Sequence, residues 1–402
     1  MNTDLIYGIC AVLCAGLLAF ALTPIVRVLA IKIKAIDVPT DGRRMHRKPI
    51  PRIGGLAIFL AFTITSVGFC KLARELATIL VGGCTLVLLG ILDDIYRLNA
   101  FLKLVVQIIV ALFAVSQGVT IDFIGVGGRY IPFGAWSIPI TVLWIVGLTN
   151  AVNFIDGLDG LACGVSAISS ISLFFVMLLS GSSTVHCLIT AILAASCLGF
   201  LPFNTNPAKI FMGDTGALFL GYTLSVISVS GVFKIDMLLA FFVPLVIFGF
   251  PLADTAFAVF RRIAHGKSPF APDRGHLHHR LMDMGFGQKQ SVRILYAVCA
   301  ILGISAIMLT DESTLGGVLV LAAALIIFFV IFMILKNPKL RIHSGIYNED
   351  DGAAPLVETF DDVIGIPSVE AEAAAPADVQ TDETKEPEHE KEQNESGSPG
   401  EE

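Results

Sequence analysis

Long apolar runs divide this sequence: stretches of 15 to 25 mostly hydrophobic residues alternate with short polar ones. A run of about 20 apolar residues is long enough to cross the hydrocarbon core of a bilayer as a helix. Helices are expected because the interior of a bilayer offers no hydrogen-bond partner to the edge of an open sheet. We therefore expect an all-α, multi-pass integral membrane protein.

Eleven runs meet this criterion and predict about eleven transmembrane helices. The composition agrees, because 55% of the 402 residues are hydrophobic and only 15% are charged, whereas soluble domains carry about 25% charged residues. Pro139 interrupts the fifth run and makes it the weakest. The stretch 118–133 is predicted to form a short external hairpin. The eleven runs are 4–30, 54–72, 76–92, 101–117, 134–149, 160–180, 184–201, 216–232, 237–256, 294–310 and 314–335.

Lysine and arginine are distributed unevenly between the two sets of loops that these runs define. Eleven crossings would place the termini on opposite sides of the membrane. Of the 25 Lys and Arg residues before the tail, only four fall on the side of the N-terminus: Lys71, Arg74, Arg129 and Lys234. Because positive residues favour the cytoplasmic side, we expect the N-terminus outside and the C-terminus in the cytoplasm. The expected location is the inner (plasma) membrane.

The end of the chain differs in character from the rest. From Glu349 onward there are eighteen acidic and two basic residues, a net charge of −16, so the remaining chain carries +9 although the whole carries −7. Few large apolar residues occur there, which predicts a disordered, solvated segment. We divide the chain into a polytopic membrane domain, 1–342, and a disordered acidic cytoplasmic tail, 343–402. A membrane scaffold whose tail recruits partners is one alternative function.

Polar residues gather in four segments on the predicted cytoplasmic side. Adjacent carboxylates such as Asp93 and Asp94 repel unless a cation or a basic group compensates them. Oxygen ligands from Asp and Asn without Cys suit a hard cation such as Mg²⁺, and Lys and Arg nearby suit phosphate groups. The pattern therefore predicts a site for a metal-bound diphosphate. The four segments are 93–97, 150–160, 204–216 and 274–280.

Each motif also has a structural interpretation. An Asp pair at a helix end can mark the membrane interface, and Asp-Gly pairs are common in turns. Asp214 precedes an apolar run, where it could cap a helix. The histidines could be an interfacial cluster or a transition-metal site. The conjunction of four such segments on one side favours an active site. Ionisable residues are scarce at the expected midplane, which counts against a polytopic transporter.

Five segments resemble the polyprenyl-phosphate N-acetylhexosamine-1-phosphate transferases, glycosyltransferase family 4. They are 44–55, 93–94, 150–161, 211–216 and 276–279, which occur in order and with family-like spacing. The resemblance implies about ten or eleven helices and a reaction that joins a UDP-aminosugar to a membrane polyprenyl phosphate. UMP is released, and the sugar remains linked to the lipid through a diphosphate. One substrate is soluble and the other is a lipid, so the expected active site lies at the cytoplasmic face.

The resemblance also implies roles for the acidic residues. Asp214 is the leading metal ligand, with Asn153 as the second, and the expected metal is Mg²⁺ or alternatively Mn²⁺. Asp93 and Asp94 would act near the attacking lipid phosphate, either as a base or by orienting it. The same site would be shaped by Asp156 and Asp159.

Substrate contacts follow in the same way. Asn204 and Phe211 match positions that hold uridine, with the phenyl ring stacking on uracil. Phosphate contacts are implied for Lys103, Lys48 and Arg47. The loop that selects the sugar contains His276, His278 and His279.

The histidine loop also indicates a branch of the family. His276-Leu-His278-His279 followed by Arg280 resembles the branch that uses UDP-N-acetylglucosamine (UDP-GlcNAc) to initiate O-antigen, teichoic acid or similar polymers. The branch that acts on UDP-MurNAc-pentapeptide usually has a run of histidines before an acidic residue, and related UDP-HexNAc donors remain alternatives. The expected partners are UDP-GlcNAc, undecaprenyl phosphate and the bilayer, with no nucleic acid. A homodimer is left open.

Overall fold

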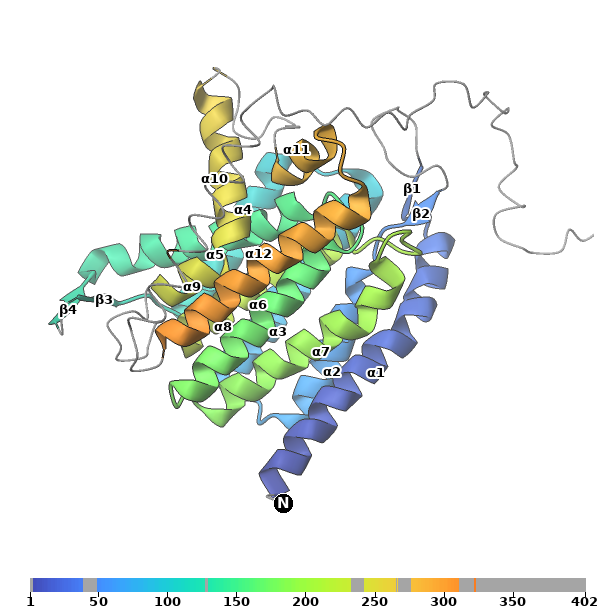
Figure 1. Ribbon diagram of the computed structural model, residues 1–402. Coiled ribbons are helices and arrows are strands. Elements are labelled where there is room, and N and C mark those ends of the chain that lie inside the picture. The colour runs from blue at the N-terminus through green and yellow to red at the C-terminus, as the bar shows by residue number, and fades with distance from the viewer. Residues whose placement is uncertain are drawn as a thin grey trace, which may run out of the picture. The chain divides into compact units, whose positions relative to one another are not determined.

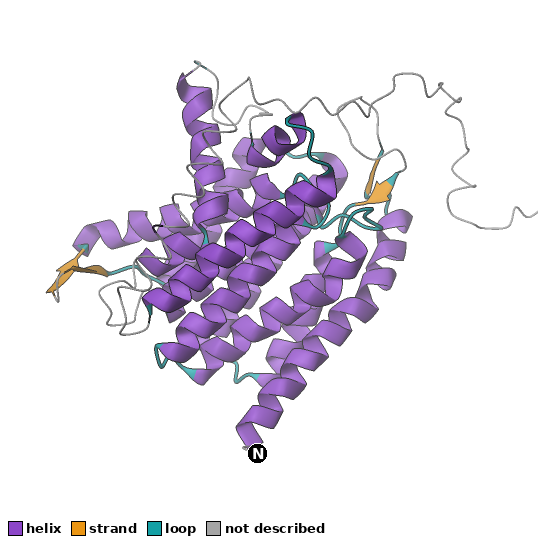
Figure 2. Ribbon diagram, viewed as in Figure 1, coloured by secondary structure: helices purple, strands orange, loops and turns teal. Residues whose placement is uncertain are grey.

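Helices dominate the part of the chain that the structure describes (Figures 1 and 2). The computed structural model describes residues 3–38, 49–126, 129–232, 242–264, 266, 276–310 and 322. Its contacts divide the chain into the units Met1–Ser344 and Gly345–Glu402, and the described residues all belong to the first. The predicted acidic tail lies outside the described residues, and so does the eleventh run apart from residue 322.

Each of the first ten predicted runs overlaps a described helix or helix pair. The helices are α1 (Thr3–Lys32), α2 (Gly55–Phe69), α3 (Arg74–Tyr96), α4 (Ala100–Ser116), α5 (Ser137–Ile155), α6 (Leu161–Leu179), α7 (Thr184–Asn204), α8 (Gly213–Gly231), α9 (Phe242–Ile247), α10 (Gly249–Ala264), α11 (Leu277–Asp283) and α12 (Gln288–Leu309), with a single 3₁₀ turn η1 (Gly134–Trp136) before α5.

Six helices among the described residues are long and apolar enough to cross a membrane: α1, α3, α5 with η1, α6, α7 and α12. The apolar helices α2 and α4 are shorter. The chain is therefore a multi-pass, mostly helical membrane protein. The number of eleven crossings and the sides on which the termini lie stay predictions.

Two short antiparallel hairpins accompany the helices. In the first, β1 (Ile36–Asp37) pairs with β2 (Ile50–Pro51). The second pairs β3 (Phe123–Val126) with β4 (Arg129–Pro132), which confirms the hairpin predicted within 118–133. Asp122 fixes its base to the start of α5, because its carboxylate accepts a hydrogen bond from the Ser137 hydroxyl at 2.8 Å.

Two prolines affect the helices in ways that the sequence analysis did not predict. Pro139 does not interrupt the fifth helix, because it lies in the first turn of α5, where a backbone N–H has no intrahelical acceptor. The ninth run was expected to be one helix over 237–256, and this is wrong. The helix breaks at Phe248, between α9 and α10. Pro251 explains the break, since it cannot donate to the carbonyl of Ile247 and its ring clashes with that carbonyl.

Helix α8 lies at the centre of the bundle. It packs against α2, α3, α5, α6 and α7, and nearly every residue from Gly213 to Gly231 is buried. Two threonines and three serines occur along it, and it is not among the six helices that qualify as membrane spans by composition. A helix that contacts protein on every side does not need a lipid-facing apolar surface.

Glycines bring the neighbouring helices close to α8. A Cβ on Gly90 of α3 would lie 2.4 Å from the Cα atom and backbone nitrogen of Thr215, and a Cβ on Gly55 of α2 would lie 2.0 Å from the Cα atom of Gly216. Such contacts are possible only without a side chain, which is why small residues favour close helix packing in membranes. Both contacts lie at the first turn of α8.

This packing predicts different effects for two glycine substitutions. Gly90→Ala should lower the melting temperature by several degrees, because overpacking a rigid backbone contact costs about 1–3 kcal/mol. The matched control is Gly147→Ala on α5, where a Cβ meets nothing within 4 Å. Thermal unfolding of the two detergent-purified variants is the measurement. Equal melting temperatures would contradict the close α3–α8 contact.

Candidate active site

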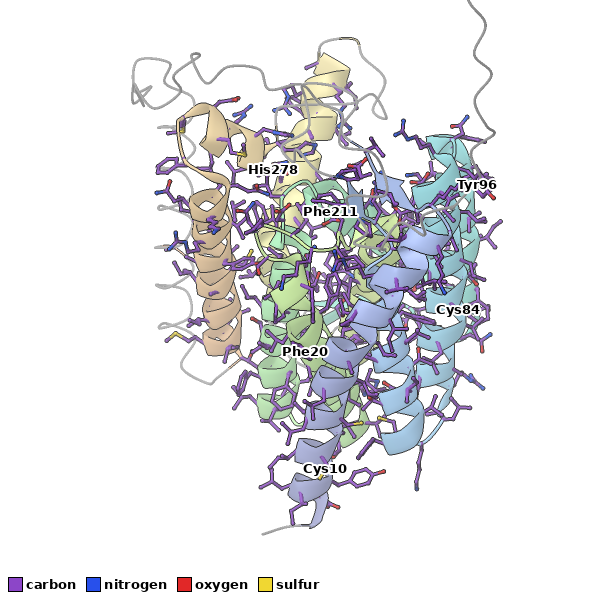
Figure 3. The ribbon with its side chains drawn as sticks, turned by 90° about the vertical axis from the view of Figure 1, so that its right-hand side faces the viewer. Cys10, Phe20, Cys84, Tyr96, Phe211 and His278 are labelled. Carbon is purple, nitrogen blue, oxygen red and sulfur yellow. The ribbon has the colours of Figure 1, made fainter. Side chains whose placement is uncertain are left out.

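The predicted site segments lie at one end of the helix bundle. Figure 3 shows Phe211, His278 and Tyr96 toward one end of the helices and Cys10 of α1 near the other. The end of α3, the end of α5, the α7–α8 loop and the start of α11 meet there. The polar residues that the sequence places in separate loops therefore converge.

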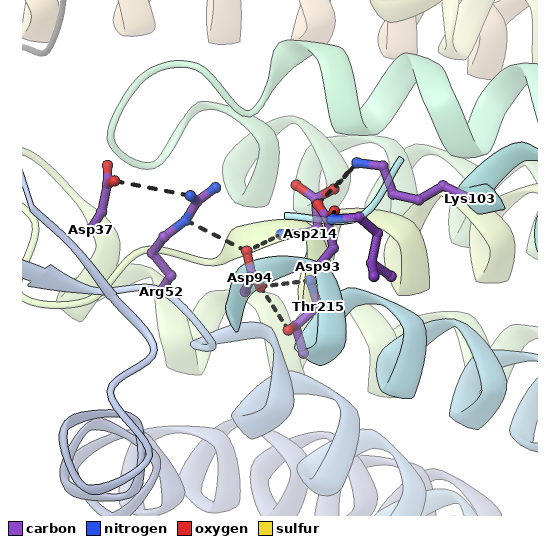
Figure 4. Close-up of polar contacts among 8 residues, drawn as sticks. Asp37, Arg52, Asp93, Asp94, Lys103, Asp214 and Thr215 are labelled. Atoms are coloured by element: carbon purple, nitrogen blue, oxygen red, sulfur yellow. Dashed lines mark hydrogen bonds and ion pairs between the residues drawn. The ribbon is translucent and has the colours of Figure 1, made fainter. Parts of the chain in front are cut away.

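Asp93, Lys103 and Asp214 form the centre of the site (Figure 4). The Lys103 ammonium donates to Asp93 Oδ2 at 2.9 Å and to Asp214 Oδ2 at 2.8 Å. The two carboxyl groups are also close enough for the pKa of each to depend on the other. Asp93 is held in place from the other side, because its Oδ1 accepts from the Leu98 backbone N–H at 2.7 Å. One ammonium group thus compensates two carboxylates from different helices.

The end of α5 adds an amide and a third carboxylate. The Asn153 side chain lies beside Asp214 and favours its ionised carboxylate, so the two predicted metal ligands are neighbours. Asp156 lies just beyond the helix, because α5 ends at Ile155. Burial, reinforced by the negative charges of Asp214 and Asp94, raises the pKa of Asp156 to about 8. Such a shift is typical of carboxylates at functional sites.

Asp94 is buried and serves the start of α8. Its Oδ1 accepts from the Asp214 backbone N–H at 3.2 Å, and its Oδ2 accepts from the backbone N–H and the hydroxyl of Thr215 at 3.1 and 2.8 Å. These donors belong to the first turn of α8, where backbone N–H groups lack intrahelical partners. Asp214 itself makes no cap, so the interpretation of Asp214 as a helix cap is wrong. The capping carboxylate comes from α3.

Arg52 also belongs to the site, although no role was predicted for it from the sequence. Its Nε lies 3.5 Å from Asp94 Oδ1. Burial disfavours the charged guanidinium, but the surrounding carboxylates, chiefly Asp94 and Asp37, outweigh this and raise the pKa of Arg52. The nearby Gly54 is a sequence signal that could have indicated that the segment with Arg52 lies against the site. A Cβ there would lie 2.5 Å from the Phe211 carbonyl, and only glycine allows the two backbone segments to approach this closely.

Asp159 organises the loop between α7 and α8. Its Oδ2 accepts from the Asn206 side chain at 2.9 Å and from the Ala208 backbone N–H at 3.0 Å. Asn206 also donates to Gln288 at the start of α12, at 2.6 Å. Asp159 therefore ties its own loop to the α7–α8 loop, and Asn206 extends the link to α12. This geometry is that of a structural anchor beside the central cluster.

The two residues matched to uridine binding flank that same loop. Asn204 is 2% exposed and donates to the Ile210 carbonyl at 3.0 Å. Within the described residues its side-chain oxygen has no hydrogen-bond partner. Phe211 is anchored through its backbone, whose N–H donates to the Pro51 carbonyl at 2.8 Å and whose carbonyl accepts from the Gly54 N–H at 2.9 Å. A buried acceptor without a partner is a feature that a bound ligand can satisfy.

The histidines lie beside the central cluster. His276 Nδ1 lies 2.8 Å from Asp254 Oδ2, and the rings of His276 and His278 are stacked with centroids 5.6 Å apart. His278 packs against the α5–α6 loop, where a Cβ on Gly157 would lie 2.6 Å from its Nε2. Burial, with the neighbouring charge of His279, lowers the pKa of His278 to about 3, so this imidazole is neutral. The other predicted contacts, Arg47 and Lys48, lie outside the described residues.

The ligand atoms at the centre of the site suit a hard divalent cation. Asp93, Asp214 and Asn153 offer oxygen ligands, and the Lys103 ammonium already bridges the two carboxylates as a cation would. The described residues contain no group of three His, Cys, Asp or Glu side chains arranged for a metal. Mg²⁺ does not require such a group, because it usually combines one or two carboxylates with waters and substrate phosphates.

Comparison with known proteins agrees with this geometry. Glycosyl transferase family 4 matches residues 76–232, a segment that contains the central cluster. A probable undecaprenyl-phosphate N-acetylglucosaminyl 1-phosphate transferase of Bacillus subtilis is 44% identical over 316 residues, 78% of this chain and 86% of that protein. A decaprenyl-phosphate N-acetylglucosaminephosphotransferase of Mycobacterium tuberculosis is 34% identical over 357 residues, with 78% and 87% covered.

A third relative, an undecaprenyl-phosphate alpha-N-acetylglucosaminyl 1-phosphate transferase of Thermotoga maritima, is 36% identical over 264 residues, 66% of this chain and 78% of that protein. Fold and site together define a multi-pass membrane protein with an acidic and basic cluster at one end. The similarity is high enough, over enough of both chains, to identify the family. The chain belongs to the polyprenyl-phosphate N-acetylhexosamine-1-phosphate transferases of glycosyltransferase family 4 and is a phosphoglycosyltransferase.

The contacts of the two adjacent aspartates predict different consequences for stability. Asp94→Asn should lower the melting temperature by several degrees, because an amide keeps only one acceptor oxygen for three buried donors and an unsatisfied donor costs about 1–3 kcal/mol. Asp93→Asn should lower it less, because its remaining oxygen still accepts from Leu98. Thermal unfolding of both purified variants tests this difference, and the opposite ranking would refute the capping role of Asp94.

Proposed function

We propose that this enzyme transfers GlcNAc-1-phosphate from UDP-GlcNAc to undecaprenyl phosphate. The products are undecaprenyl-diphosphate-GlcNAc and UMP, and the lipid-linked sugar begins a cell-surface polysaccharide such as O-antigen or teichoic acid. The observation that carries the proposal is the cluster of Asp93, Lys103, Asn153 and Asp214 at one end of the bundle. The names of the similar proteins support GlcNAc-1-phosphate as the transferred group and undecaprenyl phosphate as the lipid.

The reaction is a phosphoryl transfer between two substrates of different solubility. An oxygen of the lipid phosphate forms a bond to the phosphorus that carries GlcNAc, and the bond from that phosphorus to UMP breaks. Little covalent chemistry is required of the protein, so positioning and charge stabilisation provide most of the acceleration. We place this reaction at the cytoplasmic face of the inner membrane, because the nucleotide sugar is cytosolic and basic residues are concentrated there.

The central residues divide into two groups by their contacts. Asp214 and Asn153, from different helices, hold the divalent cation, which we propose is Mg²⁺ with Mn²⁺ as the alternative. When bound, this ion neutralises the diphosphate and makes UMP a better leaving group. Lys103 presents a cation for a phosphate oxygen. Asp93, anchored by Leu98 and Lys103, orients the attacking lipid phosphate or accepts a proton from it.

The residues around the central cluster bind the substrate or hold the structure of the site. Arg52 supplies a second positive charge near the diphosphate, while its partner Asp94 fixes the start of α8. Asn204 offers its unsatisfied oxygen to uracil, and Phe211 stacks on that base. Asp156 lies beside the central cluster, where burial favours its protonated, neutral form, and Asp159 holds the nucleotide-side loop.

The donor is the least constrained part of the proposal, and a direct assay tests it. Purified protein is mixed with undecaprenyl phosphate, Mg²⁺ and, separately, UDP-GlcNAc, UDP-GalNAc or UDP-MurNAc-pentapeptide. UMP is expected with UDP-GlcNAc and little with the others. UMP release with one of the other two nucleotide sugars would identify that sugar as the donor in place of UDP-GlcNAc. The absence of UMP with all three would refute the proposed function and favour a polytopic transporter.

Substitution of the leading metal ligand tests the site. Asp214→Asn should reduce Mg²⁺-dependent UMP release by about 100-fold or more, since disturbing even the outer partners of a metal costs about 10–100-fold. The protein should still insert into the membrane. Glu75→Gln is the control, because Glu75 is in the first turn of α3 and Asp93 is in its last. Unchanged Mg²⁺ dependence of Asp214→Asn would show that another residue holds the metal.

A further inference from the structure

Asp254 is a buried carboxylate that the reaction described above leaves without a role. It lies on α10, with a side chain that is 7% exposed. Its two oxygens make separate contacts with the segment that carries the histidines: Oδ2 lies 2.8 Å from His276 Nδ1, and Oδ1 accepts from the Leu277 backbone N–H at 2.8 Å. The carboxylate therefore holds both the ring and the backbone at the start of α11.

The contact determines which nitrogen of His276 carries a proton. A carboxylate only accepts hydrogen bonds, so the His276 nitrogen that faces Asp254 must be the donor. In a neutral imidazole the other nitrogen then has no proton and is an acceptor. Within the described residues Nε2 of His276 makes no hydrogen bond. It is left to accept a hydrogen bond from a ligand.

Ring contacts connect this imidazole to the reaction site. The His276 ring lies 6.1 Å from the ring of Phe154, measured between centroids. Phe154 directly follows the proposed metal ligand Asn153 on α5. On the other side, His276 is stacked on His278 at an interplanar angle of 7°, and His278 packs against Gly157 beside Asp156. Both neighbours of His276 therefore belong to, or pack on, the segment that carries Asn153 and Asp156.

We propose that Asp254 is a positioning residue for the sugar of the donor. It acts through His276 by holding the tautomer whose Nε2 accepts a hydrogen bond from a hydroxyl or amide N–H of the sugar. A phosphate oxygen has no proton to donate, so this nitrogen recognises the sugar and leaves the diphosphate to Lys103, Arg52 and the metal. The inference rests on the proposed function, since it assigns a role within donor binding.

The substitution Asp254→Asn tests the tautomer with little change in shape. The asparagine oxygen can still accept from the Leu277 N–H, but its NH₂ group faces His276 and donates to Nδ1. The proton then moves to Nε2, which changes from an acceptor into a donor. We expect the KM for UDP-GlcNAc to rise about 10-fold, as for the loss of one hydrogen bond in a binding site. The KM for undecaprenyl phosphate should not change.

Inhibition by UMP separates sugar positioning from a general structural role. UMP contains the uridine and one phosphate but no sugar, so its inhibition constant should be the same in Asp254→Asn and the wild type. Asp283→Asn is the matched control, because Asp283 is an exposed aspartate at the end of α11. It should leave both constants unchanged. A loss of UMP affinity equal to the loss of donor affinity would overturn the proposal.

A double substitution shows whether the effect passes through His276. If it does, Asp254→Asn should have no further effect on the donor KM once His276 is replaced by alanine, because coupled residues are not additive. Additive effects would overturn the proposal, and so would wild-type kinetics in Asp254→Asn. No UMP release by the wild-type protein with UDP-GlcNAc would be a different outcome, because it would refute the proposed function itself.

Discussion

The hydrogen bonds from Asp94 to the first turn of α8 are the interaction on which the site depends. One buried carboxylate of α3 accepts from three donors: the backbone N–H groups of Asp214 and Thr215 and the Thr215 hydroxyl. A negative charge at the N-terminal end of a helix is also favoured by the helix dipole. Because Asp93 precedes Asp94 and Asp214 provides one of the donors, the same contacts that secure α8 bring the two site carboxylates together. Stability and site geometry are thus coupled at this point.

Close backbone packing supports the same arrangement. The glycines of α2 and α3 touch the first turn of α8 without side chains between them, so the helix ends that carry the site have little freedom to shift. Arg52 is placed by β2 and the paired backbone of Phe211 and Gly54. A catalytic cluster held by packed backbone needs less reorganisation during the reaction than one held by flexible side chains.

The sequence predicted the elements and the residues that meet, but not the contacts that hold them. Run length was enough to locate the long apolar helices but not α11, which lies outside every predicted run. The motif order was enough to bring Asp93, Asn153 and Asp214 into one hypothesis. The break at Phe248 depends on a steric clash of Pro251, which hydropathy does not measure. Asp254 and His276 are 22 residues apart on separate elements, so neither periodicity nor spacing connects them. Asp94 was grouped with Asp93 because adjacent residues look alike in a sequence, although their side chains have different partners.

The polar character of α8 has a consequence for biosynthesis. A segment that is not apolar enough to qualify as a span by composition gains little from entering lipid alone. Among the described residues, the helices that pack most extensively against it are α2, α3, α5, α6 and α7, and all five precede it in the chain. When α8 leaves the ribosome, its protein neighbours have already been synthesised. The order of the helices along the chain therefore allows a helix that lipid would accept poorly to enter the membrane against protein partners.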